Sequence, residues 1–347
     1  MKVVAGIGGD LAKVPAAARR AEELGYDAVT TGETQHDSIP IMTLAAEHTE
    51  RVEVCSSVTI AFPRSPYVLA SECWDLQKFS GGRINIGLGS QVKGHVQRRF
   101  GMPWSAPAPR MRDYVRMMRA VWDTWQNGTR ANFTSENYTF TIMTPFFNPG
   151  PIEAPYPRIS ISAVNERMAA VAGEVADGLL PHGFATTKYL LDVIVPAVRK
   201  GAKRAGRSMN DVELSAGGFM VLGETESEVE QGVERLRQQV SFYGSTRSYH
   251  GVFRAHGREE LGMRLHEMSL KGQWEEMRRI IPEEVLHEFA MKATYDRLPD
   301  VLRTERWYAS RVGLNIPAGT PAQRERLAWL IDEIHKIPAP NWEAVPV

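Results

Sequence analysis

The 347 residues include 41 basic and 41 acidic side chains, so the formal net charge is zero, and 43% of the residues are hydrophobic. This composition is that of a globular protein, and the lack of any long basic run excludes a strongly basic nucleic-acid surface. No stretch approaches the roughly 18–20 apolar residues of a membrane span, and the apolar run at the N-terminus is too short for a signal peptide. We therefore expect a cytoplasmic protein that binds neither nucleic acid nor a membrane.

The two cysteines, Cys55 and Cys73, lie in apolar surroundings and show no CxxC spacing. Isolated thiols of this kind are typical of core residues in a reducing compartment. The sequence predicts two buried, free thiols.

Four predicted strands alternate with helical segments at the start of the chain, at 3–6, 28–31, 52–58 and 84–88. The fourth strand follows the turn Ser80-Gly81-Gly82 and ends in Gly87-Leu88-Gly89-Ser90. Glycines at a strand end permit a sharp turn, or leave backbone N–H groups open to a ligand. This ending is compatible both with ordinary strand punctuation and with a phosphate cradle.

The chain departs from the alternation twice. A strongly amphipathic helix over 110–125 is followed by segment 129–157, which contains a possible hairpin around 132–140 and too many prolines for a core helix. Predicted strands return at 158–161, 178–181, 213–221 and 312–316. Between the last two strands, segment 243–310 is expected to be mostly helical.

Eight strands alternating with helices predict an α/β fold of the (β/α)8 TIM-barrel type, in a single domain over 1–347 with insertions after strands four and seven. A doubly wound sheet of similar length is the alternative. The barrel is favoured because no GxGxxG motif follows the first strand.

Polar side chains lie directly after several predicted strands, which is where a TIM barrel carries its active site. The set is Glu33, His36 and Asp37 after the second strand, Ser90 and Gln91 after the fourth, Ser162 and Asn165 after the fifth, and His182 after the sixth. Glu33 and His36 are the best candidates for acid–base chemistry, although Glu33 could instead form an ion pair with Arg64 or Arg83. His36 and Asp37 have no obvious third partner, so no metal site is predicted.

Several segments resemble the luciferase-like monooxygenase superfamily, whose members are TIM-barrel oxidoreductases that use a flavin or a deazaflavin. The matching segments are 21–33 (AEELGYDAVTTGE), 52–70 (VEVCSSVTIAFPRSPYVLA), 76–90 (LQKFSGGRINIGLGS), 100–104 (FGMPW), 110–122 and 175–178 (VADG), with a weaker match at 311–317. The SGGR…GLG string in register with the P-x-SP segment is specific. The sequence is most similar to the actinobacterial branch of coenzyme F420-dependent oxidoreductases.

The resemblance implies where a cofactor would bind. It places a non-prolyl cis peptide at Ser57–Val58, behind the tricyclic ring, and it places Glu33 close to the reactive ring as an acid or a hydrogen-bond partner. Two loops would hold the coenzyme phosphate, the second of them near a helix N-terminus. Their residues are Gly89, Ser90, Gln91 and Val92 in the first loop, and Ser162, Ala163, Val164 and Asn165 in the second.

One departure from the family pattern concerns the reaction. F420-dependent dehydrogenases usually carry an acidic residue followed directly by His at the end of strand two, whereas here Thr34 follows Glu33 and the next His is His36. Val92 also stands where some sugar-phosphate dehydrogenases of the family keep a carboxylate. Both differences argue against a glucose-6-phosphate dehydrogenase.

The resemblance leaves three functions open. The first is hydride transfer between F420 and a small organic substrate, since the cofactor would carry the difficult chemistry. The second is an FMN-dependent monooxygenase, and the third is a flavin-binding barrel without turnover. We expect a homodimer, in which helix 110–125 and the helices after the sixth strand could form the interface.

Aromatic residues of the two excursions are candidates to cover the ring and the substrate, because a lid excludes water from hydride chemistry. They are Trp104, Phe146, Phe147 and Trp274, and His182 is a further candidate substrate contact. Plain packing of the excursions onto the barrel is the alternative for these aromatic residues.

Overall fold

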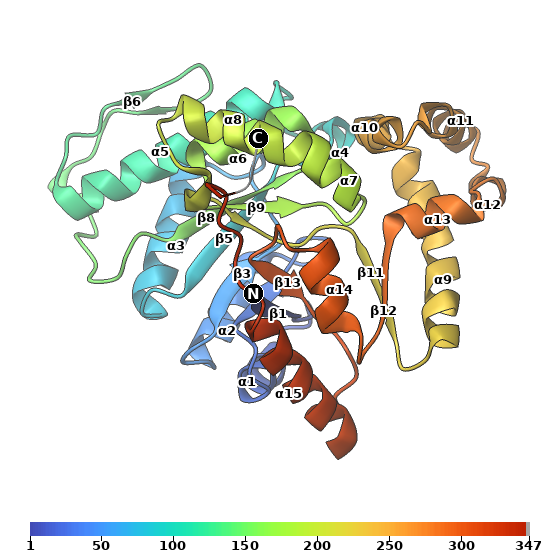
Figure 1. Cartoon of the computed structure of the whole chain (residues 1–347). Coiled ribbons are helices and arrows are strands. Elements are labelled where there is room, and N and C mark those ends of the chain that lie inside the picture. Colours follow the sequence, from blue (N-terminus) through green and yellow to red (C-terminus); the bar gives the residue numbers. More distant parts are fainter. Residues whose placement is uncertain (345–347) are drawn as a thin grey trace.

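The computed structural model describes residues 1–344 and shows a parallel barrel surrounded by helices (Figure 1). Its strands are β1 (Lys2–Gly6), β2 (Ala28–Thr31), β3 (Glu53–Ser56) with its continuation β4 (Thr59–Ile60), β5 (Ile84–Gly89), β8 (Arg158–Ala163), β9 (Gly178–Pro181), β10 (Glu213–Leu214) and β13 (Arg311–Gly313). They pair in the order β10-β9-β8-β5-β3-β2-β1-β13, and a parallel bridge between Ser215 and Arg311 joins the two ends. The predicted TIM barrel is confirmed.

Helices bury the outer surface of the barrel. They are α1 (Val14–Glu23), α2 (Ser38–Glu47), α3 (Pro66–Phe79), α5 (Pro107–Asn127), α6 (Glu166–Val175), α8 (Val195–Arg204), α14 (Leu298–Glu305) and α15 (Pro321–His335), with the short α4 (Lys93–Arg98) and α7 (Thr187–Tyr189) between strands and helices. The helix predicted over 110–125 is α5, and its large apolar side chains are core residues: Met111, Tyr114, Val115, Met118, Val121, Trp122 and Trp125. No helix within residues 1–344 is both long and apolar enough to cross a lipid bilayer.

A buried ion-pair cluster fills the barrel where the strands begin. Arg311 is 5% exposed, and it donates to Glu53 at 2.8 Å and to Glu213 at 3.2 Å. Burial alone would raise the pKa of Glu53, but Arg311 lowers it to about 2. Cys55 lies beside Arg311, with 3.7 Å between the Sγ and Nη1 atoms. Cys55 and Cys73 are buried and free, as predicted.

The segment between α5 and β8 contains the predicted hairpin. β6 (Phe133–Thr134) pairs antiparallel with β7 (Thr139–Phe140). A single turn of 3-10 helix over Pro145–Phe147 follows it. The hairpin stands away from the barrel strands, at the upper left of Figure 1.

The segment after β10 differs most from the sequence prediction. The predicted strand 213–221 is two strands: β10 stays in the barrel, and β11 (Phe219–Gly223) pairs in parallel with β12 (Ala290–Thr294) in a second sheet. Gly217 and Gly218 separate them, because a Cβ at Gly217 would lie 2.7 Å from Pro181 and Gly218 has a φ of +90°. The predicted last strand is also shorter and ends at Gly313.

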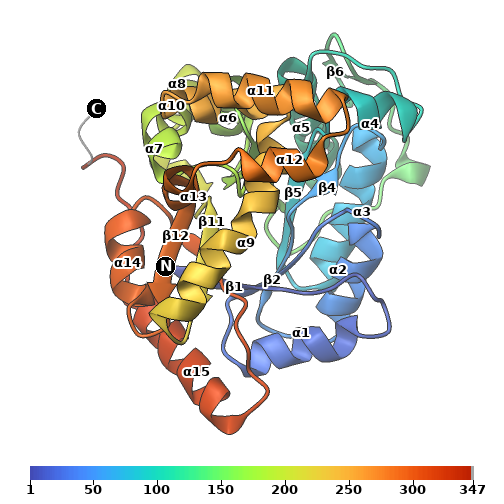
Figure 2. The ribbon, with the colours of Figure 1, turned by 90° about the vertical axis from the view of Figure 1, so that its right-hand side faces the viewer.

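Five α-helices and one short 3-10 helix (Arg247–Tyr249) lie between β11 and β12 and form a lobe beside the barrel, on the right of Figure 1 and in front in Figure 2. The α-helices are α9 (Glu226–Gly244), α10 (His250–Ala255), α11 (Glu259–Leu270), α12 (Trp274–Arg279) and α13 (Glu283–Phe289). We call residues 219–294 the lobe. The prediction of a mostly helical segment is confirmed, except that strand β12 was not expected.

Candidate functional site

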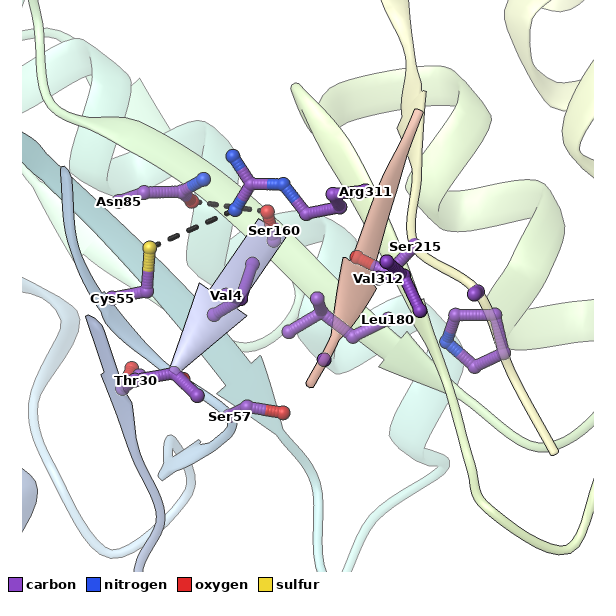
Figure 3. Close-up of a pocket in the computed structure, with 14 residues that line it drawn as sticks. Val4, Thr30, Cys55, Ser57, Asn85, Ser160, Leu180, Ser215, Arg311 and Val312 are labelled. Atoms are coloured by element: carbon purple, nitrogen blue, oxygen red, sulfur yellow. Dashed lines mark hydrogen bonds between the residues drawn. The ribbon is translucent and has the colours of Figure 1, made fainter. Parts of the chain in front are cut away.

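A cavity of about 190 Å³ lies inside the barrel (Figure 3). Residues on or directly after all eight barrel strands line it, and the lining is rich in hydroxyl groups: Thr30, Ser56, Ser57, Ser160 and Ser215. Arg311 and Cys55 belong to the lining on the side of the ion-pair cluster. The Thr30 Oγ1 atom is buried and has no hydrogen-bond partner within residues 1–344. The lining therefore combines apolar surface with hydroxyl groups, and its charged side chain, Arg311, is held in the ion-pair cluster.

One wall of the cavity is the bulge between β3 and β4. The strand predicted over 52–58 ends at Ser56 and resumes at Thr59. The peptide bond between Ser57 and Val58 is cis, as the family resemblance implied. We call residues 56–60 the bulge.

Three glycines make room for this bulge. A Cβ atom on each of them would collide with it: 2.8 Å from Ser57 O at Gly32, 2.0 Å from Ser56 O at Gly87, and 2.4 Å from Val58 Cγ2 at Gly89. Contacts below about 3 Å force a shift of the neighbour, and two of these neighbours are backbone atoms. The Gly87-Leu88-Gly89 motif therefore seats the bulge against β5.

Glu33 is tied to the same bulge. Its side chain is 6% exposed and forms an ion pair with Arg64 at 2.8 Å. The Oε2 atom also accepts from the Ile60 N–H at 2.7 Å, and the Oε1 atom accepts from the Ser38 hydroxyl at 2.7 Å. Of the two arginines considered as alternatives, Arg64 is the partner, whereas Arg83 donates to backbone carbonyls after α2.

Hydroxyl groups continue this network across the sheet. The Ser38 and Thr59 hydroxyl oxygens lie 2.7 Å apart, and those of Thr59 and Ser56 lie 2.8 Å apart. Ser56 Oγ in turn accepts from the Gly87 N–H at 3.0 Å. Glu33 is thus the end of a chain of contacts that joins β2, the bulge and β5.

His36 lies outside the cavity. It is exposed, and its ring covers Gly9, where a Cβ would lie 2.4 Å from the His36 Cδ2 atom. The neighbouring Asp37 caps α2 and pairs with Arg64 at 2.6 Å. The acid–base roles of Glu33 and His36 stay predictions.

The two loops predicted to hold a phosphate are neighbours, because β5 and β8 pair directly. Within residues 1–344, the backbone N–H groups of Ser90, Gln91, Val164 and Asn165 donate to no protein atom. Gln91 has a left-handed backbone, with φ of 56°. Asn165 caps α6, so a helix N-terminus opens at the second loop. Free N–H groups of this kind are a ready anion cradle.

His182 follows Pro181, which lines the cavity. Its Nδ1 atom accepts from the Phe184 N–H at 3.0 Å. Its ring centroid lies 4.7 Å from that of Tyr243 and 4.9 Å from that of Tyr249. Burial lowers the pKa of His182 to about 4. Tyr243 and Tyr249 were not predicted, because no local pattern distinguishes them from the other aromatic residues of the lobe.

The four aromatic residues proposed as covers do not line the cavity. Phe146 and Phe147 pack on each other and are 89% and 67% exposed. Trp274 is 48% exposed and lies against Phe242 in the lobe. Trp104 is half-buried in the segment before α5.

Comparisons with known proteins agree with this architecture. A family model described as luciferase-like monooxygenase matches residues 3–308. The protein Rv1360 of Mycobacterium tuberculosis is 41% identical over 303 residues, covering 87% of this chain and 89% of Rv1360. The 5,10-methylenetetrahydromethanopterin reductase of Archaeoglobus fulgidus is 24% identical over 313 residues, covering 87% of each protein.

A solved structure supports the fold independently. The coenzyme F420-dependent tetrahydromethanopterin reductase from Methanopyrus kandleri superimposes with a TM-score of 0.73 at 20% sequence identity. The match covers 96% of this chain and 98% of that one. The barrel and its lobe therefore follow an architecture already known from enzymes.

Proposed function

The chain belongs to the luciferase-like monooxygenase family, whose members are oxidoreductases, and from this premise we propose that it transfers a hydride between coenzyme F420 and a small organic substrate. The proposal is carried by two features that occur together: a bulge that packs against three glycines, and two loops whose N–H groups donate to no protein atom in the described part of the chain. The similarity to an F420-dependent reductase favours the deazaflavin over FMN.

The loops after β5 and β8 would hold the phosphate of the cofactor. The N–H groups of Ser90, Gln91, Val164 and Asn165 are unpaired within residues 1–344, and such donors gain an acceptor when a phosphate binds. The N-terminus of α6 adds a favourable dipole at the second loop. This set of donors fits a phosphate on a ribityl chain without a dedicated basic side chain.

The remaining chemistry follows from the cavity and the bulge. When bound, the deazaflavin supplies two-electron hydride transfer. The bulge would support the ring, and the hydroxyl groups of Thr30 and Ser57, which line the cavity, would orient the substrate.

In this proposal Glu33 is a positioning residue. Both of its carboxylate oxygens already accept hydrogen bonds, from Arg64, Ile60 and Ser38. Because these donors occupy both oxygens, the carboxylate is held in one position against the bulge. It fixes the bulge on which the ring would rest.

An FMN-dependent monooxygenase is the second candidate, and the family description itself favours it. The two loops would take the phosphate of FMN as readily as that of F420. The two candidates therefore differ in the ring and not in the phosphate site.

Cofactor binding tests the proposal. The purified full-length chain is titrated with F420 and with FMN while cofactor fluorescence is followed, and we expect quenching by binding of F420 alone. Gln91→Glu adds a negative charge to the phosphate loop and should weaken F420 binding about tenfold. Gln231→Glu, on the exposed face of α9, is the matched control. Binding of FMN alone would overturn the F420 proposal, and binding of neither would overturn both candidates.

A further inference from the structure

We propose that His182, Tyr243 and Tyr249 form a substrate-recognition site, in which the His182 Nε2–H donates a hydrogen bond to a carbonyl oxygen of an uncharged, planar substrate. This inference rests on the proposed function, because it assumes that the reacting end of the substrate lies in the barrel cavity. It assigns a specificity-determining role to His182.

The hydrogen-bond pattern fixes which ring nitrogen of His182 can donate. The Phe184 N–H donates to Nδ1 at 3.0 Å, so Nδ1 acts as an acceptor and the proton of the neutral imidazole resides on Nε2. Burial disfavours the charged form and lowers the pKa to about 4, and no charged neighbour contributes to this shift. At neutral pH the ring is therefore an uncharged donor.

The donor is available to a ligand. Within residues 1–344, neither His182 Nε2 nor the hydroxyl groups of Tyr243 and Tyr249 form a hydrogen bond to the protein. None of the three atoms is among the buried polar atoms left without a partner, so each reaches accessible space. Three open polar atoms thus lie on three rings that pack within 6 Å of one another.

The position of His182 connects it to the rest of the site. The preceding residue, Pro181, lines the cavity and pairs with Ala163 at the end of β8. The Tyr189 hydroxyl donates to Val164 O at 3.0 Å and so holds the second phosphate loop beside the same region. His182 is thus the residue directly after the last β9 residue that lines the cavity.

The chemistry of the surroundings selects the class of substrate. The rings of Tyr243 and Tyr249 flank His182, and Phe219 extends the aromatic wall at 6.4 Å from Tyr243. Aromatic faces favour a planar, apolar ligand. A charged group in this wall would lose hydration without meeting an opposite charge. An aryl or conjugated carbonyl compound fits both requirements, whereas a carboxylate does not.

Binding of a matched series of small probes tests the site. Acetophenone carries the carbonyl oxygen, ethylbenzene lacks an acceptor, and benzoate carries a charge. With the full-length chain labelled with nitrogen isotope at histidine, we expect acetophenone to shift the Nε2 resonance of His182. We expect benzoate and ethylbenzene to bind at least about tenfold more weakly, the value of one hydrogen bond.

Two variants separate recognition from packing. His182→Phe keeps an aromatic ring but removes the donor, and should weaken acetophenone binding about tenfold while ethylbenzene binding is unchanged. His182→Gln can donate from a similar position and should restore acetophenone binding. Equal binding of acetophenone and benzoate, or an Nε2 resonance that does not respond to acetophenone, would overturn the proposal even if the Phe variant failed to fold.

The failure of this inference is distinguishable from failure of the proposed function. F420 titration of the same variants reports on the cofactor site, which His182 does not contact in the proposal. F420 binding without selective acetophenone binding would leave the hydride-transfer proposal intact and remove the role of His182. Selective acetophenone binding without F420 binding would support the role of His182 and overturn the hydride-transfer proposal.

Discussion

The two walls of the candidate site are held in different ways. The bulge is fixed by backbone contacts of three glycines and by the short hydrogen bonds that end at Glu33. The wall around His182 is held by ring packing against residues that lie more than 60 positions further along the chain, on α9 and in the turn after it. The first wall leaves little freedom for substitution, whereas the second can change its side chains without disturbing the barrel.

This difference suggests a division of labour. A cofactor is the same in every turnover and benefits from a rigid support, since pre-organisation reduces the ordering required on binding. Substrate preference is set by the side chains that face the variable part of the ligand. The bulge would therefore serve the cofactor, and the lobe would serve the substrate.

We expect the largest difference in stability between the two walls when a side chain is added in the space next to the bulge. Gly87→Ala would place a Cβ 2.0 Å from the Ser56 carbonyl oxygen, and overpacking against backbone should lower the free energy of unfolding by about 3 kcal/mol or more. Gly8→Ala is the control, because a Cβ there meets no atom of residues 1–344 within 4 Å. Urea unfolding measures both, and equal stability of the two variants would show that the bulge is not rigidly seated.

The next largest loss of stability is expected at Glu33. Glu33→Gln leaves Arg64 without its buried counter-ion, so we expect a loss of about 2 kcal/mol in the free energy of unfolding together with weaker F420 binding. Asp37→Asn is the control, because Asp37 contacts the same arginine but is 52% exposed. If Glu33→Gln kept both stability and F420 affinity but lost turnover, Glu33 would be the proton donor and not a positioning residue.

The wall around His182 should make stability depend on pH. The pKa of His182 in the folded protein is about 4, below its ordinary value of 6.5, so between these two values the unfolded chain binds more protons. The free energy of unfolding should therefore fall as pH falls through this window, by about 2 kcal/mol from this residue.

His182→Gln should remove that part of the pH dependence. The half-buried His250 and His256 also have lowered pKa values and contribute to the slope, so the relevant quantity is the difference between wild type and variant. Unfolding measured at a series of pH values gives it. Parallel curves for the two proteins would mean that His182 is not buried as a neutral ring.

The smallest effect is expected at the exposed aromatic pair of the first excursion. Phe146→Ser and Phe147→Ser remove side chains that are 89% and 67% exposed and outside the cavity. We expect each to change the free energy of unfolding by less than about 0.5 kcal/mol and to leave F420 affinity unchanged. A loss of affinity in fluorescence titration would restore these residues as covers of the ring.

The sequence indicated the bulge wall well because its signals are local. Gly87 and Gly89 lie on β5, and the Ser57–Val58 peptide interrupts the neighbouring strand of the sheet. Each segment belongs to a motif of the family, so the resemblance predicted the position of the cis peptide correctly. The partner of Glu33 was left open between Arg64 and Arg83. That choice depends on where two loops meet in space, which no pattern within either loop records.

The wall around His182 was not predicted, because it too depends on contacts between segments that are distant in the sequence. The apolar run over 213–221 looks like one strand, and the exit from the barrel depends on the approach of Gly217 to Pro181. Strand β12 is five residues long and lies between two helices, so its alternation is too short to stand out. Tyr243 and Tyr249 can be recognised as site residues only from their contacts with His182 in the folded protein.

Isotope transfer tests the central claim most directly. Reduced F420 labelled with deuterium at its hydride-donating carbon is mixed with the full-length chain and a conjugated carbonyl substrate in the absence of oxygen. Our account predicts that the deazaflavin is oxidised and that one deuterium appears in the product. Product that forms only with reduced FMN and labelled dioxygen, and that carries the oxygen label instead of deuterium, would contradict it.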